Sequence, residues 1–149
     1  MSSGFEPRDP DYQQRVRESF ARQGLLATFA AQLETIEPGV VEIHVPFSTG
    51  LTQQDNFFHA GVGIAALDSA CDYAALSLMA PATRVLTVEL KVNLLSPAVG
   101  DFLIARGEVV RPGRNLTVCR GDAYAASDDG SKHVATMLAT MTGVAERNA

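Results

Sequence analysis

The spacing of apolar and polar side chains changes several times along the chain, and each change marks an expected element. Residues 41–47 alternate with a period of two, which predicts a half-buried strand. Pro46 cannot donate a ladder hydrogen bond, so we expect it on an edge strand or at the end of this strand. The preceding residues 11–33 have a helix-compatible composition, interrupted near Gly24. They predict one or two short helices, followed by a turn at residues 37–39.

From about His59 to Met79 the chain becomes alanine-rich and apolar on nearly all sides. A segment of this length could cross a bilayer, but Asp68 and Asp72 would then lie in the hydrocarbon, and alanine and glycine supply little insertion energy. A helix without a polar face is otherwise one that is surrounded by protein. The pattern therefore predicts a long central helix and no membrane association, ended by Pro81.

Four strand-like segments follow this helix, and turn signals rich in Gly, Pro, Asp and Ser separate them. Their residue ranges are 84–95, 101–111, 115–127 and 132–143. Short connections favour antiparallel neighbours. The predicted fold class is therefore α+β, with a five-stranded antiparallel sheet wrapped around the long helix and a helical segment at the N-terminus.

The composition limits the classes of function. The 149 residues suit a single domain, 1–149, in which residues 1–10 are expected to form a loose arm. With a formal net charge of −5, the chain has no overall positive field for nucleic acid. Cys71 and Cys119 lack metal-ligand or redox-motif spacing, and the N-terminus lacks a secretory pattern. We expect a cytoplasmic protein that needs no metal or other cofactor.

Asp68 interrupts the apolar helix, where an ionised carboxylate is costly. Either it faces a cleft that water or a ligand reaches, or it is paired with a donor as a structural group. Asp72 lies one turn further along the same face. It could share the work of Asp68, or it could point to solvent or accept a donor from the rim of the sheet.

His59, Ala60 and Gly61 stand at the start of the long helix, where free backbone N–H groups could polarise a carbonyl oxygen. Alternatively, the glycine only relieves crowding and the histidine is structural. Asp68 follows His59 by nine positions, which corresponds to about 13 Å along a helix axis. The acid and the helix start can therefore serve one carbonyl only if they come from different subunits.

Four segments, in this order, resemble the hotdog-fold acyl-CoA thioesterases of the phenylacetate-degradation (PaaI-like) type. They are residues 51–61, Leu67-Asp68, residues 87–98 and residues 113–118. The resemblance covers most of the chain. It implies a hotdog fold, hydrolysis of acyl-CoA to the free acid and CoA, and a homo-oligomer that is a dimer or a dimer of dimers.

The resemblance also assigns roles to residues. Asp68 would be the general base or nucleophile, and His59 with the backbone of Ala60 and Gly61 would bind the carbonyl. The turn at Arg111, Arg114 and Asn115 resembles the loop that meets the CoA phosphates, a role for which clustered arginines suffice even in an acidic protein. The same arginines could instead form a solvated turn.

Three positions in the resemblance need particular attention. Ala60 stands where the family has the first glycine of a pair, and Gln53 stands where some relatives have asparagine. Thr87 matches a hydroxyl residue that helps to position water in relatives. Strict alternation would place Thr87 on the same face as Glu89 and Lys91, so that this face would have to turn towards a dimer seam.

Two other functions fit the predicted fold. A hotdog hydratase or dehydratase acting on enoyl thioesters would need a histidine and an acid around the acyl chain, and neither His44 nor His133 has recognisable surroundings for that chemistry. A non-catalytic acyl-CoA-binding module could use the same cleft, although it would not need Asp68.

Overall fold

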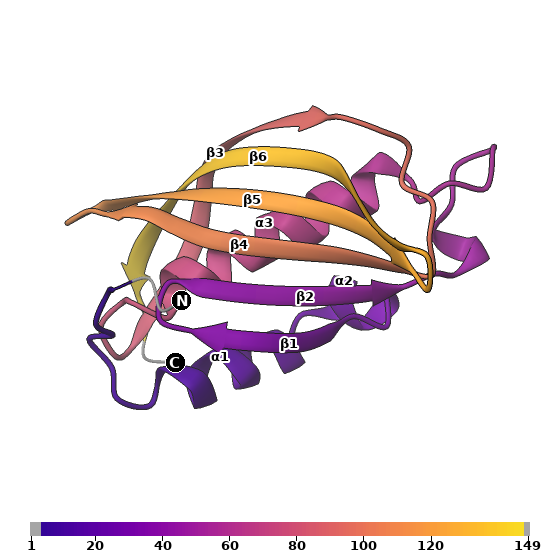
Figure 1. Cartoon of the computed structure of the whole chain (residues 1–149). Coiled ribbons are helices and arrows are strands. Elements are labelled where there is room, and N and C mark those ends of the chain that lie inside the picture. The colour runs from indigo at the N-terminus through magenta and orange to yellow at the C-terminus, as the bar shows by residue number, and fades with distance from the viewer. Residues whose placement is uncertain (1–3, 148–149) are drawn as a thin grey trace.

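The computed structural model describes residues 4–147 and contains one antiparallel sheet with a long helix along one face (Figure 1). In chain order the elements are α1 (Tyr12–Ala21), α2 (Gly24–Thr28), β1 (Gln32–Glu37), β2 (Val40–Pro46), a short 3-10 turn (Thr49–Leu51), α3 (Ala60–Leu76), β3 (Thr83–Leu94), β4 (Phe102–Pro112), β5 (Leu116–Ser127) and β6 (Gly130–Ala145). The strand order across the sheet is β1-β2-β4-β5-β6-β3. The expected α+β arrangement, a sheet wrapped around a central helix, is confirmed.

The sheet has one strand more than the five expected. Residues 32–37 form β1, although their neighbours favoured helix and residues 37–39 were expected only as a turn. That turn is the tip of a hairpin, because Glu37 pairs with Val40 and Gly39 has a φ of 76°. Pro-Gly at the two central positions of a turn suits a type II conformation. Pro46 is the last residue of β2, and β2 lies inside the sheet. Of the two positions expected for this proline, an edge strand or the end of a strand, the second is the observed one.

The helix α3 packs most tightly against β4 near its middle. Leu67, Ala70 and Ala74 are fully buried against the sheet. A Cβ atom at Gly107 would lie 2.3 Å from the carbonyl carbon of Ala70, so only glycine permits the observed approach of helix and strand. None of the helices within residues 4–147 is both long and apolar enough to cross a membrane. The close contact fixes α3 on the sheet and hence fixes the positions of the side chains that α3 carries.

The C-terminal end of α3 is held by the N-terminal part of the chain. Arg15 of α1 donates hydrogen bonds to the carbonyl oxygens of Leu76 and Met79, each at 2.8 Å. These bonds satisfy acceptors that a helix end leaves unpaired. Arg15 also pairs with Asp9 at 3.3 Å, and Asp9 is buried. Part of the arm expected over residues 1–10 is thus bound to the body of the protein, and residues 1–3 lie outside the described residues.

Candidate active site

Two carboxylates on α3 converge on one hydroxyl of the edge strand β3. Thr87 Oγ1 lies 2.7 Å from Asp68 Oδ1 and 3.3 Å from Asp72 Oδ1. All three residues are half-buried. A hydroxyl has a single proton to donate, so it can give a full hydrogen bond to only one of the two acids. The shorter contact selects Asp68 as the acceptor, which leaves the Thr87 oxygen able to accept a hydrogen bond from a protonated Asp72.

Asp72 has the environment of an acid that holds its proton. Burial, and next the negative charge of Asp68, raise the pKa of Asp72 to about 7, although the contact with the Thr87 hydroxyl lowers it. Near neutral pH a protonated Asp72 can donate to Thr87 while Thr87 donates to Asp68. Asp72 contacts Thr87 at the rim of the sheet, as part of the second alternative stated for it, and the alternative that it shares the work of Asp68 stays a prediction.

A β-bulge explains how Thr87 reaches the helix. The register of β3 against β6 shifts between Thr87 and Glu89, with Thr87 opposite Met141 and Glu89 opposite Thr140. The extra residue reverses the alternation of sides beyond this point. Thr87 therefore faces α3, whereas Glu89 faces the other side of the sheet and accepts a hydrogen bond from Thr140. The expectation that Thr87 and Glu89 share a face was wrong, since a bulge has no clear signal in the local pattern.

At the start of α3, His59 caps the helix. Its Nδ1 accepts a hydrogen bond from the Gly61 N–H at 2.8 Å. An accepting Nδ1 carries no proton, so the ring proton is on Nε2. The N–H groups of Ala60 and Gly61 belong to the first turn, which has no acceptors within the helix. A carbonyl oxygen that binds the Gly61 N–H must replace His59 Nδ1 as the acceptor. His59 and Gly61 are both exposed, so a ligand can reach this N–H.

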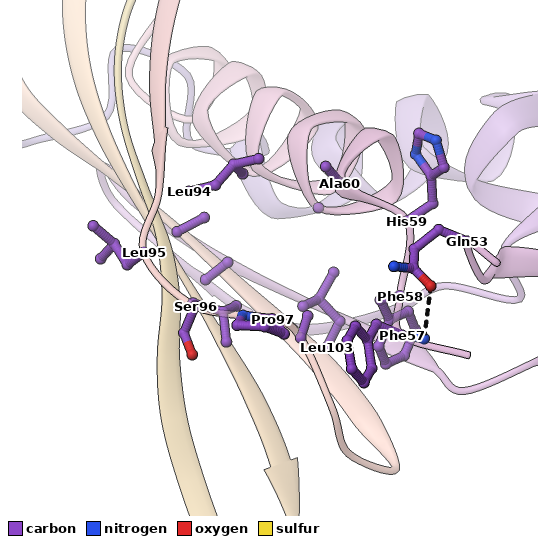
Figure 2. Close-up of a pocket in the computed structure, with 15 residues that line it drawn as sticks. Gln53, Phe57, Phe58, His59, Ala60, Leu94, Leu95, Ser96, Pro97 and Leu103 are labelled. Carbon is purple, nitrogen blue, oxygen red and sulfur yellow. Dashed lines mark hydrogen bonds between the residues drawn. The ribbon is translucent and has the colours of Figure 1, made fainter. Parts of the chain in front are cut away.

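A cavity of about 480 Å³ opens beside this helix start (Figure 2). Its walls are mainly apolar, from the loop before α3, from the end of β3 with the loop that follows, and from strands β4 to β6; Phe57, Phe58, Leu94, Leu95, Pro97 and Leu103 are examples. Gln53, His59 and Ser96 supply polar atoms. Gln53 Oε1 accepts a hydrogen bond from the Phe57 N–H at 3.3 Å, drawn as a dashed line in Figure 2. Gln53 therefore stabilises the loop that forms one wall.

The candidate residues named from the sequence fall into separate groups in one chain. Gln53, His59 and Ala60 line the cavity. Asp68, further along α3, meets Thr87 of β3, and neither residue is part of the cavity wall. The apolar wall from the two loops was missed, because the sequence pattern of a loop does not reveal which segment it meets. α3 is continuous from Ala60 to Leu76, so its rise per residue places Asp68 about 13 Å along the axis from the helix start.

The residues expected to bind CoA form a third group. Arg111 is exposed near the end of β4, and Arg114 and Asn115 lie in the turn between β4 and β5. Arg114 and Asn115, together with Arg8, line a second cavity of about 220 Å³ at the C-terminal end of α3. Seventeen helical residues span about 25 Å, so this group and the helix start lie at opposite ends of one chain, as Figure 1 shows. Arg8 was not named from the sequence.

Other chemistry-bearing groups are sparse in the described part of the chain. Over residues 4–147, no three His, Cys, Asp or Glu side chains gather in a way that could hold a metal ion. Cys71 and Cys119 are free and buried. Burial raises the pKa of the Cys119 thiol to about 12, which makes it a poor nucleophile. Asp68, Asp72 and the start of α3 therefore remain the candidate catalytic groups.

Comparison with known proteins assigns the family. The model of the thioesterase superfamily matches residues 55–132, more than half of the chain. A thioesterase family protein from Silicibacter pomeroyi is 51% identical, with a TM-score of 0.88 over 90% of this chain and 98% of that one. A thioesterase of Haemophilus influenzae (16% identity, TM-score 0.77, 87% and 89% covered) and the PaaI protein of Escherichia coli (15%, 0.81, 91% and 95%) share the fold. The protein is therefore a hotdog-fold member of the thioesterase superfamily.

Proposed function

We propose that this protein hydrolyses acyl-CoA thioesters to the free acid and CoA, in an active site that two copies of the chain build together. The observation that carries the proposal is the arrangement of α3. Asp68, bonded to Thr87, and the exposed helix start at Gly61 lie on one rigid helix but too far apart to act on the same carbonyl. A second copy of the helix, running the other way, would supply the missing half of each site.

The edge strand β3 offers the surface for that second copy. It is 12 residues long, and within residues 4–147 it pairs with β6 alone. Leu86, Val88 and Leu94 on this strand are each more than half exposed. A long, apolar and unpaired edge promotes association with another strand. Antiparallel pairing of β3 with β3 of a second copy would be isologous and would place the two α3 helices side by side in opposite directions. The assembly is then a dimer, or a dimer of dimers.

In the proposed reaction the thioester carbonyl oxygen binds at the start of α3, where the N–H groups of Ala60 and Gly61 stabilise the negative charge that develops on it. Asp68 of the other protomer takes a proton from water as the water oxygen bonds to the carbonyl carbon. The C–S bond then breaks, and the CoA sulfur receives a proton. Direct attack by Asp68, through a mixed anhydride that water hydrolyses, balances equally well. No metal or other cofactor takes part.

Thr87 and Asp72 support Asp68 in this scheme. Thr87 donates to Asp68, which fixes the orientation of the carboxylate. Asp72, with its pKa raised to about 7, can hold a proton and donate it to Thr87. This hydrogen-bonded chain connects the two acids through one hydroxyl group. Gln53 acts on the other half, by stabilising the loop beside His59.

The CoA part of the substrate is assigned to the turn between β4 and β5. Arg111, Arg114 and Asn115 would contact its phosphates, and Arg8 adds a further cation beside Arg114. In an antiparallel pair of α3 helices, the C-terminal end of one helix lies near the start of the other. The turn of one protomer would thus approach the cavity of its partner. Such a local cluster is needed because the protein as a whole carries a net charge of −5.

The cellular partners follow from the same proposal. The substrate is a small molecule, and neither nucleic acid nor membrane is a proposed partner. Two buried free cysteines suit a reducing compartment, so we place the enzyme in the cytoplasm.

The proposal is tested by measuring free thiol released from a panel of acyl-CoA thioesters. Loss of the carboxylate in Asp68→Asn should lower kcat/KM by about 10²- to 10⁴-fold, the range typical of a general base. Asp129→Asn, which alters an exposed turn acid far from α3 in sequence, is the control and should match the wild type. Near-normal turnover by a folded Asp68→Asn protein would contradict the assignment. A hydratase would instead consume enoyl absorbance without releasing thiol, and a binding module would do neither.

A further inference from the structure

Gly63 is a glycine inside α3 that the packing of the protein does not require. A Cβ atom at this position would meet only Leu103 Cδ2, at 3.7 Å, which is ordinary van der Waals contact. Glycine is less stable than alanine in a helix interior, because it gains conformational entropy on unfolding. The position therefore lowers helix stability without a compensating contact in the described structure.

Other glycines in the fold show the contrast. At Gly107 a Cβ would lie 2.3 Å from the Ala70 backbone, and at Gly121 it would lie 3.0 Å from Leu67 and 3.1 Å from Cys71 Sγ. Those two positions need glycine so that helix and sheet can approach closely. Gly63 has no such neighbour.

The direction in which Gly63 faces indicates what the missing side chain leaves open. Leu67 and Ala70 lie four and seven positions later and are fully buried against the sheet, so Gly63 is on the sheet-facing side of α3. Ala123 of β5 and Ala135 of β6 are direct partners in the sheet and line the same cavity as Gly63. Three elements thus each contribute a very small residue at the same place.

We propose that Gly63 is a specificity-determining residue, whose missing side chain keeps room between α3 and the sheet for a bulky, uncharged, apolar acyl group. The inference rests on the proposed function, in which the thioester carbonyl binds at Gly61, two positions earlier on the helix. From that point the acyl group enters the cavity and extends towards Gly63, Ala123 and Ala135.

The size and chemistry of the cavity define the class of acyl group. A cavity of about 150 Å³ lined by apolar side chains binds benzene. The volume of about 480 Å³ here is roughly three times as large, although it is open on one side. Among the described residues that line it, none is Lys, Arg, Asp or Glu, so a charged acyl group such as succinyl would lose hydration without gaining an ion-pair partner. Octanoyl and phenylacetyl groups fit this description better than acetyl or succinyl groups.

The test compares the selectivity of wild type with that of Gly63→Ala and Gly63→Leu. Selectivity is the ratio of kcat/KM for octanoyl-CoA to kcat/KM for acetyl-CoA. One carbon in an apolar pocket changes such a ratio by about tenfold or more, so Gly63→Leu should lower it by at least about tenfold and Gly63→Ala by less. Gly24→Leu is the matched control, since a Cβ at Gly24 of α2 meets nothing within 4 Å and lies outside the cavity. An unchanged ratio in Gly63→Leu overturns the inference.

A binding measurement separates this inference from the proposed function. Octanoate should raise the melting temperature of the wild type and of Gly24→Leu, and should have little effect on that of Gly63→Leu. If no acyl-CoA releases thiol but octanoate still discriminates between the variants in this way, the hydrolase proposal fails and the apolar site remains. If thiol is released but octanoate and the selectivity ratio are insensitive to residue 63, the hydrolase proposal stands and the site assignment fails. Melting temperatures without ligand establish that each variant is folded.

Discussion

The middle and the start of α3 differ in almost every respect that matters for chemistry. In the middle, the helix lies tightly on the sheet at Gly107, and two acid side chains meet Thr87 on the edge strand. At the start, the helix leaves a cavity open beside Gly63, and the chemistry available is that of backbone N–H groups next to His59. In the proposed site, one chain carries both halves without assembling them, because the continuous helix holds Asp68 away from the helix start. A second copy of the chain would bring complementary halves together.

Among three further substitutions, at Gly61, Thr87 and Asp72, blocking the helix start should have the largest effect. Gly61→Val places a branched side chain where the carbonyl oxygen is proposed to bind, since even a Cβ there would approach His59 Nδ1 to 3.0 Å. The expected loss in kcat/KM is about 10²- to 10³-fold, the range for losing one oxyanion donor. Gly61 is exposed, so the fold should persist, which circular dichroism can check. Activity within a few-fold of wild type would show that the carbonyl binds elsewhere.

Removing the Thr87 hydroxyl, which contacts Asp68, should have a smaller effect than blocking the helix start. Thr87→Val deletes the hydrogen bond to Asp68 while keeping the shape of the side chain. A hydrogen bond to a charged group contributes roughly 1.5–3 kcal/mol, so kcat should fall by about 10- to 100-fold. Thr87→Ser keeps the hydroxyl and should recover most of the activity. A serine variant as slow as the valine variant would mean that Thr87 acts through packing and not through its hydroxyl.

The smallest expected effect is a pH-dependent change in stability at Asp72. Its pKa is raised to about 7, so the folded protein binds this proton more tightly than the unfolded chain does. Stability that is fully present below about pH 4 is therefore lost as the pH rises to about 7. Asp72→Asn cannot ionise and should avoid this loss. We compare the unfolding free energy of Asp72→Asn with that of the wild type by urea denaturation at two pH values. The difference, variant minus wild type, should be roughly 1 to 3 kcal/mol larger at pH 8 than at pH 4. A difference that does not change with pH would rule out this role for Asp72.

Local patterns in the sequence were sufficient for some parts of the fold and insufficient for others. The long helix and the four strands after it follow from apolar runs and clear turn signals, and the structure places them within a few residues of expectation. β1 was missed because only one of its six residues, Ile36, is buried. Its apolar pattern is therefore weak, and its hairpin with β2 decides its conformation.

The candidate site shows the same limit more sharply. Asp68 could be named from the sequence because it is a carboxylate in an apolar helix. Its contact with Thr87 could not, because that contact depends on a bulge and on pairing between β3 and β6, which are distant in sequence. Family resemblance supplied Thr87 where the pattern alone argued against it. The role of Gly63 becomes visible only when the space around it can be measured, because a helical glycine has the same appearance in a sequence whether it relieves a clash or leaves a cavity.

Subunit complementation tests the shared site most directly. Asp68→Asn and Gly61→Val chains carrying different affinity tags are co-expressed, and the mixed dimer is purified through both tags. One of its two sites then has both lesions, and the other pairs an intact acid with an intact helix start. The account predicts that two nearly inactive parents give a mixed dimer with about half of the wild-type kcat, as follows from the twofold symmetry of the assembly. A mixed dimer as inactive as its parents, or a protein that stays monomeric, would contradict it.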